Sequence, residues 1–288
     1  MNGILHKIGK FGLVWRLLIF AIILVALVSP LMILSNSLLQ FLFGAIILTG
    51  LLIAWSRRVD GHSVRQYGLD ASIAMGAELA IGLIIGFLSV GLMFLLVAFP
   101  SGLNRLSFQN QIFNAAFGLF FLKSALVAYW EETIFRGFLL VNFRDKFSCG
   151  FGKIGGTIAA ITTSSMLFGM IHIGTDHFSW LALAILTLNG VVWCIPMLLT
   201  GRLGMSIGLH ASWNFSQSKV FGFAMSGNAS QGALLNGELT GGDIWTGGAY
   251  GPEGGLLGGV GLIAMLALII VYGFWSKNVR RIATRSVD

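Results

Sequence analysis

Residues 113–136 read FNAAFGLFFLKSALVAYWEETIFR, a long apolar stretch that ends in two adjacent glutamates, Glu131 and Glu132, followed by an arginine. The apolar part is typical of a membrane-spanning helix, which needs about 20 mostly apolar residues in a row. Ionisable side chains are costly inside a bilayer, and where they occur they usually serve a function. This stretch therefore predicts a membrane helix that carries two carboxylates into the protein interior.

The composition of the whole chain also indicates a membrane protein. Of its 288 residues, 56% are hydrophobic and 10% are charged, and the mean hydropathy is +0.86. A soluble domain has about 25% charged residues. We therefore expect a polytopic protein that has the lipid bilayer as a partner and binds no nucleic acid.

Apolar windows divide the chain into about eight predicted transmembrane helices, so the expected fold is all-α. The predicted spans are 13–35, 39–56, 73–99, 113–143, 155–174, 178–200, 203–224 and 256–276. The span 113–143 is longer than a bilayer requires, so we expect it to tilt or to extend beyond the membrane.

Basic residues fall mainly into alternate loops of this eight-span arrangement. They lie before the first span, after the second, fourth and sixth spans, and at the end of the chain: Lys7, Lys10, Arg16, Arg57, Arg58, Arg65, Arg144, Lys146, Lys153, Arg202, Lys277, Arg280, Arg281 and Arg285. Arg105 and Lys219 depart from this pattern. Because Lys and Arg concentrate in cytoplasmic loops, the distribution predicts a multi-pass protein of the cell membrane with both termini in the cytoplasm.

The segment 225–255 differs in composition from the predicted spans. It contains ten glycines together with Glu238, Asp243 and Glu253, and it has no basic residue. Glycine-rich segments of this kind behave as flexible linkers. The composition therefore favours a flexible external tether over the alternative, a lid that covers a cavity.

Three of the predicted spans carry pairs of residues four positions apart. The pairs are Glu132 with Arg136, Phe168 with His172, and His210 with Asn214. Residues four apart share a helix face, so Glu132 can form an ion pair with Arg136. Glu131 is rotated from Glu132 by about 100° and points elsewhere. Taken singly, the pairs also fit ordinary roles as an ion pair, a core histidine or a hydrogen bond between helices.

Together these residues supply the parts of a hydrolase that needs no covalent intermediate. A glutamate or a histidine can act as a general base towards water. A second histidine and an asparagine can donate hydrogen bonds to a developing oxyanion. Two histidines and a carboxylate can also hold a catalytic zinc ion, for which Glu131, His172 and His210 are the candidate ligands.

The motifs resemble, in order and internal spacing, those of the type II CAAX prenyl protease family (CPBP), which are intramembrane endopeptidases. The matching motifs are Glu131-Glu132-Thr133-Ile134-Phe135-Arg136-Gly137, Phe168-x-x-x-His172 and His210-x-x-x-Asn214. The resemblance covers about 113–224 and implies a bacterial member, and bacterial members are related to bacteriocin-immunity proteins. It leaves both a glutamic-type and a metal-dependent mechanism open.

The resemblance implies a role for each motif residue. Glu131 would activate the attacking water with help from His172, and His210 and Asn214 would stabilise the oxyanion. Glu132, Arg136 and Phe168 would support the site. The expected substrate is a peptide or a membrane-anchored protein.

The resulting organisation has three regions. Residues 1–112 would hold the N-terminal transmembrane helices and a cytoplasmic connector. Residues 113–224 would form a protease core of four helices, and residues 225–288 the Gly-rich external loop and the final transmembrane helix.

Two other functions remain open from the sequence. The same fold can serve as a non-catalytic membrane scaffold or a bacteriocin-immunity-type factor. A proton-coupled transporter is the third hypothesis, with Glu78, Lys123 and Glu131 as a relay of intramembrane ionisable groups. For Glu78 and Lys123 we favour a structural ion pair or a lysine that reaches towards the membrane surface.

Overall fold

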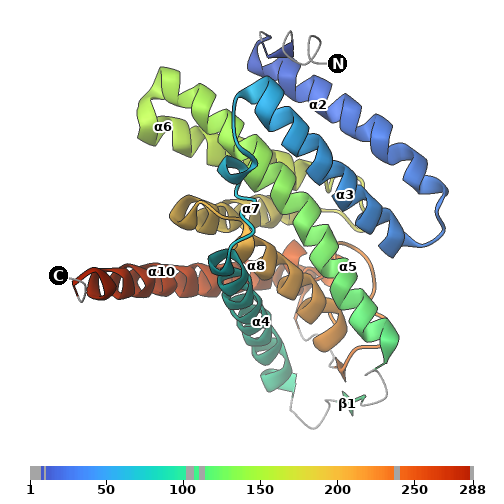
Figure 1. Ribbon diagram of the computed structural model, residues 1–288. Helices are drawn as coiled ribbons and strands as arrows, with labels where there is room; N and C mark the ends of the chain where they lie inside the picture. The colour runs from blue at the N-terminus through green and yellow to red at the C-terminus, as the bar shows by residue number, and fades with distance from the viewer. Residues whose placement is uncertain (1–7, 10, 102–106, 110–113, 237–240, 286–288) are drawn as a thin grey trace.

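The computed structural model describes residues 8, 9, 11–101, 107–109, 114–236 and 241–285 (Figure 1). Within these residues the fold is helical apart from one short antiparallel pair, β1 (Ser107–Phe108) with β2 (Leu235–Asn236), and an isolated bridge. Eight helices in this part of the chain have 12 residues or more. The predicted all-α fold of a polytopic membrane protein is confirmed.

The long helices run in chain order through the whole described structure. They are α2 (Leu13–Val28), α3 (Ser37–Trp55), α4 (Ile73–Ser101), α5 (Ala115–Glu132), α6 (Leu140–Met170), α7 (Trp180–Thr200), α8 (Gly204–Phe215) and α10 (Leu256–Arg285). Shorter helical segments lie between them: η1 (Ser29–Ile33), η2 (Ser56–Asp60), η3 (Val64–Tyr67), η6 (Thr133–Leu139), η7 (Ser216–Val220), α9 (Asp243–Thr246), η8 (Gly248–Tyr250) and η9 (Pro252–Gly254).

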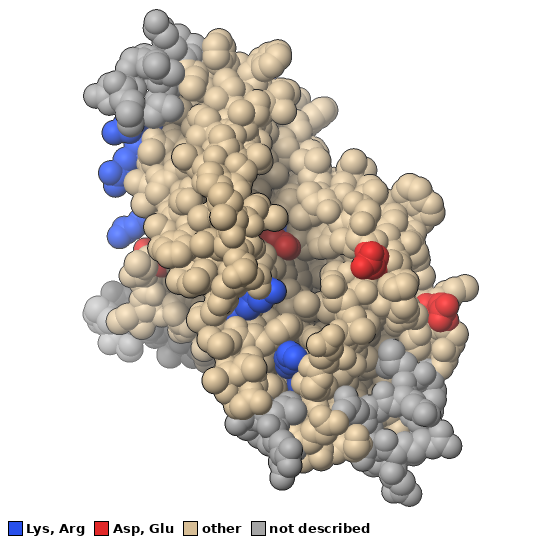
Figure 2. Space-filling view, turned by 90° about the vertical axis from the view of Figure 1, so that its right-hand side faces the viewer, with Lys and Arg blue, Asp and Glu red and all other residues tan. Residues whose placement is uncertain are grey.

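Five helical segments of the described chain are long and apolar enough to cross a membrane. They are Leu13–Ile33, Ser37–Asp60, Ile73–Phe99, Trp180–Thr200 and Leu256–Ser276. All five coincide with predicted spans. The other three predicted spans correspond to α5, α6 and α8, the helices near the polar motifs. Figure 2 shows one face of the molecule, on which few charged side chains interrupt a largely uncharged surface that is hollowed near its centre.

The helix that carries the glutamates continues far beyond them. α5, the π-helical segment η6 and the first part of α6 follow one another without a break, as Figure 1 shows. The chain then reverses at Gly152, whose φ of 68° lies in the left-handed region that favours glycine. Gly156 in the returning arm packs against the backbone of Ser148, so the two arms of α6 form a tight hairpin.

α8 and α4 cross with their backbones in contact. Gly82 and Gly86 on α4 and Gly204 and Gly208 on α8 each face a backbone carbonyl of the other helix, so closely that a Cβ would collide with it. Both helices thus carry a G-x-x-x-G pattern, which lets membrane helices approach closely. The contact fixes α8 against a helix that can span the membrane.

α8 is also the most enclosed helix of the bundle. Every residue from Gly204 to Trp213 is buried. Met205 and Leu209 belong to an apolar cluster shared with α4, α7 and α10, whereas Leu203 and Ile207 belong to a second cluster shared with α2, α3 and the α5–α6 rod. α8 therefore joins the two halves of the core.

The prediction that Glu78 pairs with Lys123 is wrong. Glu78 is 3% exposed on α4, and its Oε2 accepts a hydrogen bond of 2.9 Å from Nε of Arg202. The ammonium of Lys123 instead lies 6.0 Å from the centre of the Phe41 ring. The bond between α4 and the start of α8 reinforces the glycine contact, and it arises because Arg202 follows α7 directly beside α4.

The Gly-rich segment is not a free tether, contrary to the interpretation that its composition favours. Its described residues, 225–236 and 241–255, include α9, η8 and η9, and Thr246, Tyr250 and Glu253 are buried. Positive φ angles at Gly247 and Gly251 permit the tight turns between these segments. The glycines therefore allow close packing around a few buried anchors; Glu238 lies outside the described residues.

We predict that Gly82→Ala destabilises the protein, because the new Cβ must separate two backbones in contact; overpacking costs about 1–3 kcal/mol. Gly76→Ala on the same helix is the matched control, since nothing lies within 4 Å of the Cβ position there. Alanine has a helix propensity about 1 kcal/mol better than glycine, so the control should be neutral or stabilising. Thermal unfolding in detergent measures both; equal midpoints would contradict the contact.

Candidate active site

Glu132 lies at the end of α5, and its carboxylate accepts hydrogen bonds from two side chains. Its side chain is fully buried, and its Oε1 accepts hydrogen bonds from Nη1 of Arg136 at 3.0 Å and from Nδ1 of His210 at 2.9 Å. The pair with Arg136 is the one that the four-residue spacing predicts. The structure also brings in His210 from α8, so one carboxylate joins two of the three motifs.

Glu131 lies on the opposite edge of the same imidazole. Its Oε2 is 3.8 Å from Nε2 of His210, and its side chain is 24% exposed. This distance is longer than a direct hydrogen bond, so Glu131 and His210 are close neighbours without being bonded to each other. The two adjacent glutamates thus lie at the two ring nitrogens of His210. The buried Glu132 is bonded to Nδ1, and the partly exposed Glu131 faces Nε2.

Aromatic rings enclose these polar groups. The imidazole of His210 stacks on Trp193 of α7, with ring centroids 4.1 Å apart and an interplanar angle of 27°. The guanidinium of Arg136 lies 4.2 Å from the centre of the Phe168 ring, a distance typical of a cation–π contact. Phe168 therefore covers the buried cation, which explains its place among the supporting residues.

His172 follows the end of α6, which stops at Met170 rather than including His172 as the predicted span 155–174 does. Its Nδ1 lies 2.9 Å from the carbonyl oxygen of Phe168. Because a carbonyl can only accept a hydrogen bond, Nδ1 carries the proton and Nε2 keeps a free lone pair. His172 is therefore in the tautomer that can accept a proton at Nε2.

Asn214 lies one helical turn after His210 on α8 and is half-buried. Among the described residues, its side-chain amide has no hydrogen-bond partner. An amide without a partner in the protein is available to donate to a substrate carbonyl or oxyanion. Asn214 thus shares a face of α8 with His210, whose Nε2 lies 3.8 Å from Glu131.

The predicted zinc ligands do not form a metal-binding group in the described part of the chain, where no three His, Cys, Asp or Glu side chains come together as one. Nδ1 of His210 is bonded to Glu132 and Nδ1 of His172 to a carbonyl. Such bonds also orient histidines that bind metals through Nε2, so the misfit to a zinc centre rests on the spacing of the three side chains.

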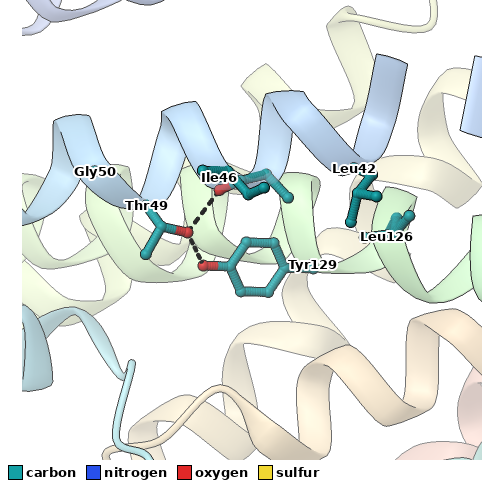
Figure 3. A pocket seen from close by; sticks show the side chains of 7 residues that line it. Leu42, Ile46, Thr49, Gly50, Leu126 and Tyr129 are labelled. Carbon is teal, nitrogen blue, oxygen red and sulfur yellow. Dashed lines mark hydrogen bonds between the residues drawn. The ribbon is translucent and has the colours of Figure 1, made fainter. Parts of the chain in front are cut away.

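One cavity lies apart from the motif residues. It has a volume of about 400 Å³ between α3 and α5, and Figure 3 shows its side chains: Leu42, Ala45, Ile46, Thr49, Gly50, Leu126 and Tyr129. The hydroxyl of Tyr129 donates to Oγ1 of Thr49 at 2.5 Å, which in turn donates to the carbonyl of Ala45 at 2.6 Å. Both hydroxyls are satisfied, and the remaining lining is apolar, so this groove is not the candidate site.

Sequence reasoning missed two contributors to the site. Trp193 supports the His210 ring but lies in an apolar span in which no spacing distinguishes it. The glycines at the α4–α8 contact do carry a signal, because Gly82, Gly86, Gly204 and Gly208 form two G-x-x-x-G pairs in the sequence.

We predict losses of stability of very different size for alanine variants of the two adjacent glutamates. Glu132→Ala leaves Arg136 buried without its carboxylate, and breaking a buried pair in this way costs about 3–5 kcal/mol. Glu131→Ala removes a partly exposed side chain and should cost less than about 1 kcal/mol. Chemical unfolding in detergent measures both; a similar loss for the two variants would contradict the separation of their roles.

Comparison with known proteins gives a match for part of the chain. Residues 113–216 match the family described as type II CAAX prenyl endopeptidase Rce1-like. No curated protein and no solved structure matches the chain. The matched segment includes Glu131, His172, His210 and Asn214. Residues 113–216 are therefore similar to the Rce1-like domain of type II CAAX prenyl endopeptidases.

Proposed function

We propose that the protein is an intramembrane endopeptidase that hydrolyses a peptide bond with a water activated by glutamate and histidine. The observation that carries the proposal is the imidazole of His210 held between Glu132 at Nδ1 and Glu131 at Nε2, within the segment that matches the endopeptidase family. A buried and a partly exposed carboxylate on one imidazole are suited to different tasks.

Glu131 is the general base in this proposal. It is the accessible one of the two carboxylates, and its Oε2 lies 3.8 Å from Nε2 of His210, so a water beside this pair can contact both side chains. His172 assists through its free Nε2. The ring of Phe168 packs against both imidazoles, with its centroid 5.2 Å from that of His172 and 6.3 Å from that of His210, which supports the placement of His172 near the attacking water.

His210 and Asn214 stabilise the oxyanion. Nε2 of His210 must carry a proton to donate, and the Glu132 carboxylate at Nδ1 supports this by stabilising an imidazolium, as an acidic partner does in other hydrolases. The free amide of Asn214 lies one turn away and supplies a second donor. Arg136 balances the charge of Glu132, so the two glutamates can stand next to each other.

We further propose a peptide or membrane-anchored protein as the substrate. This is supported by the five helical segments that are long and apolar enough to cross a membrane: 13–33, 37–60, 73–99, 180–200 and 256–276. Residues 113–224 form the protease core in this proposal, flanked by the N-terminal helices and by the segment 225–288.

We predict that purified protein cleaves a membrane-anchored peptide and that Glu131→Gln lowers kcat by about 100-fold or more, since general-base catalysis contributes about 10²–10⁴. Asn214→Ala should lower kcat by about 100-fold, the effect of one oxyanion donor. Asp243→Asn, at an exposed acid on α9, is the control and should retain activity. Unchanged turnover in Glu131→Gln would overturn the assignment and favour a scaffold that only binds a partner.

The orientation of the chain in the membrane is also a proposal. The hairpin of α6 carries Arg144, Lys146 and Lys153, and the excess of basic residues on alternate loops places this hairpin and both termini in the cytoplasm.

We predict that the exposed thiol of Cys149 in this hairpin reacts with a membrane-impermeant maleimide only when the cytoplasmic side is accessible. The second thiol, Cys194, is buried and should stay unlabelled, so a Cys149→Ser variant gives the background. Labelling of intact cells without permeabilisation would contradict the proposed topology.

A further inference from the structure

Glu253 is a buried carboxyl group that the proposed mechanism does not use. It belongs to the short helix η9 in the Gly-rich segment, and it is 3% exposed. Its Oε1 accepts two hydrogen bonds from Ser226, one from the backbone nitrogen at 2.5 Å and one from Oγ at 2.6 Å. One carboxylate therefore joins the two ends of the Gly-rich segment, since Ser226 and Glu253 are 27 residues apart in the sequence.

Ser226 adopts a backbone conformation that needs support. Its φ of 48° lies in the left-handed region, which residues other than glycine seldom occupy. Such conformations persist where the surrounding structure over-determines them, and they cluster at functional sites. The two hydrogen bonds from Ser226 to Glu253 supply that support.

The turn at Ser226 presses against the connection that follows His172. Gly227 approaches the carbonyl of Asp176 so closely that a Cβ there would collide with it, and its nitrogen donates to the carbonyl of Tyr250 at 3.1 Å. Within the same connection, Gly174 has a φ of 95°, in the left-handed region that favours glycine. The Gly-rich segment thus packs directly on the α6–α7 connection.

The same connection holds the backbone of His172. Thr175 donates to the carbonyl of His172 from both its Oγ1, at 2.8 Å, and its backbone nitrogen, at 3.2 Å. A displacement of Asp176 therefore reaches His172 through one short turn. Burial raises the pKa of Glu253, while the hydrogen bonds from Ser226 act to lower it.

We propose that Glu253 is a positioning residue for His172: by fixing Ser226, it presses the turn at Gly227 onto the α6–α7 connection and holds the imidazole beside the attacking water. The inference rests on the proposed function for its effect on turnover. The Gly-rich segment is, in this view, a brace for one of the catalytic side chains.

Three variants test this role through activity. Glu253→Ala removes the acceptor, and kcat should fall about 10-fold or more, because small misplacements of catalytic groups are costly. KM should change by less than about 3-fold, since substrate binding is not involved. Glu253→Gln keeps an oxygen that accepts from Ser226 and should stay within about 3-fold of the wild-type kcat. Ser226→Ala removes one of the two donors and should give a smaller loss in the same direction.

Asp243→Asn is the matched control, because Asp243 is an exposed acid of the same segment; it should leave kcat and KM unchanged. A loss of kcat in Glu253→Gln equal to that in Glu253→Ala would overturn positioning by hydrogen bonds. Full activity of a folded Glu253→Ala protein would overturn the role altogether.

Hydrogen exchange supplies a readout that does not depend on catalysis. Amides 171–178 should exchange on the order of 10-fold faster in Glu253→Ala and Ser226→Ala, but not in Asp243→Asn, because the connection loses its brace. Unchanged exchange would overturn the inference. If the wild-type protein cleaves no peptide, the proposed function fails, while the exchange rates still decide whether Glu253 holds the connection.

Discussion

The carboxylate of Glu132 is the group on which the arrangement of the site depends. It is fully buried, and a buried charge is tolerated only when it is paired and hydrogen-bonded. Its partners, Arg136 and His210, come from η6 and α8, so satisfying this one carboxylate locks the glutamate helix onto the histidine helix. The same bond fixes which nitrogen of His210 faces Glu131, and it frees Glu131 to remain partly exposed.

Two features of the backbone make this pairing possible. The glycine contact between α4 and α8 anchors α8 in the centre of the bundle, where all residues from 204 to 213 are buried. The π-helical segment η6 begins directly after Glu132, and such local changes of helical geometry frequently occur at functional sites. The other residues of the candidate site thus lie on helices, and only His172 lies on a turn. In the proposed role, Glu253 holds that turn in position.

Much of this structure follows from patterns in the sequence. Hydropathy predicts the helices because a span must be long and apolar, and the four-residue spacing predicts the pair of Glu132 with Arg136 because it reports a helix face. Spacing does not report which helix a face meets, so the bond of Glu132 to His210, the stacking of Trp193 and the pairing of Glu78 with Arg202 required the structure. For the Gly-rich segment, composition wrongly predicted a flexible tether. The number of glycines does not reveal that Tyr250 and Glu253 are buried and hold the segment in place.

The most direct test of this account is an experimental structure of the protein with a peptide analogue of the tetrahedral intermediate. The account predicts that one oxygen of the analogue lies about 2.7–3.1 Å from both Nε2 of His210 and the amide of Asn214. The oxygen that represents the attacking water should contact Glu131, and Glu132 should remain bonded to Arg136. An analogue bound without contact to His210 and Asn214, or with Glu132 in the place assigned to Glu131, would contradict the account.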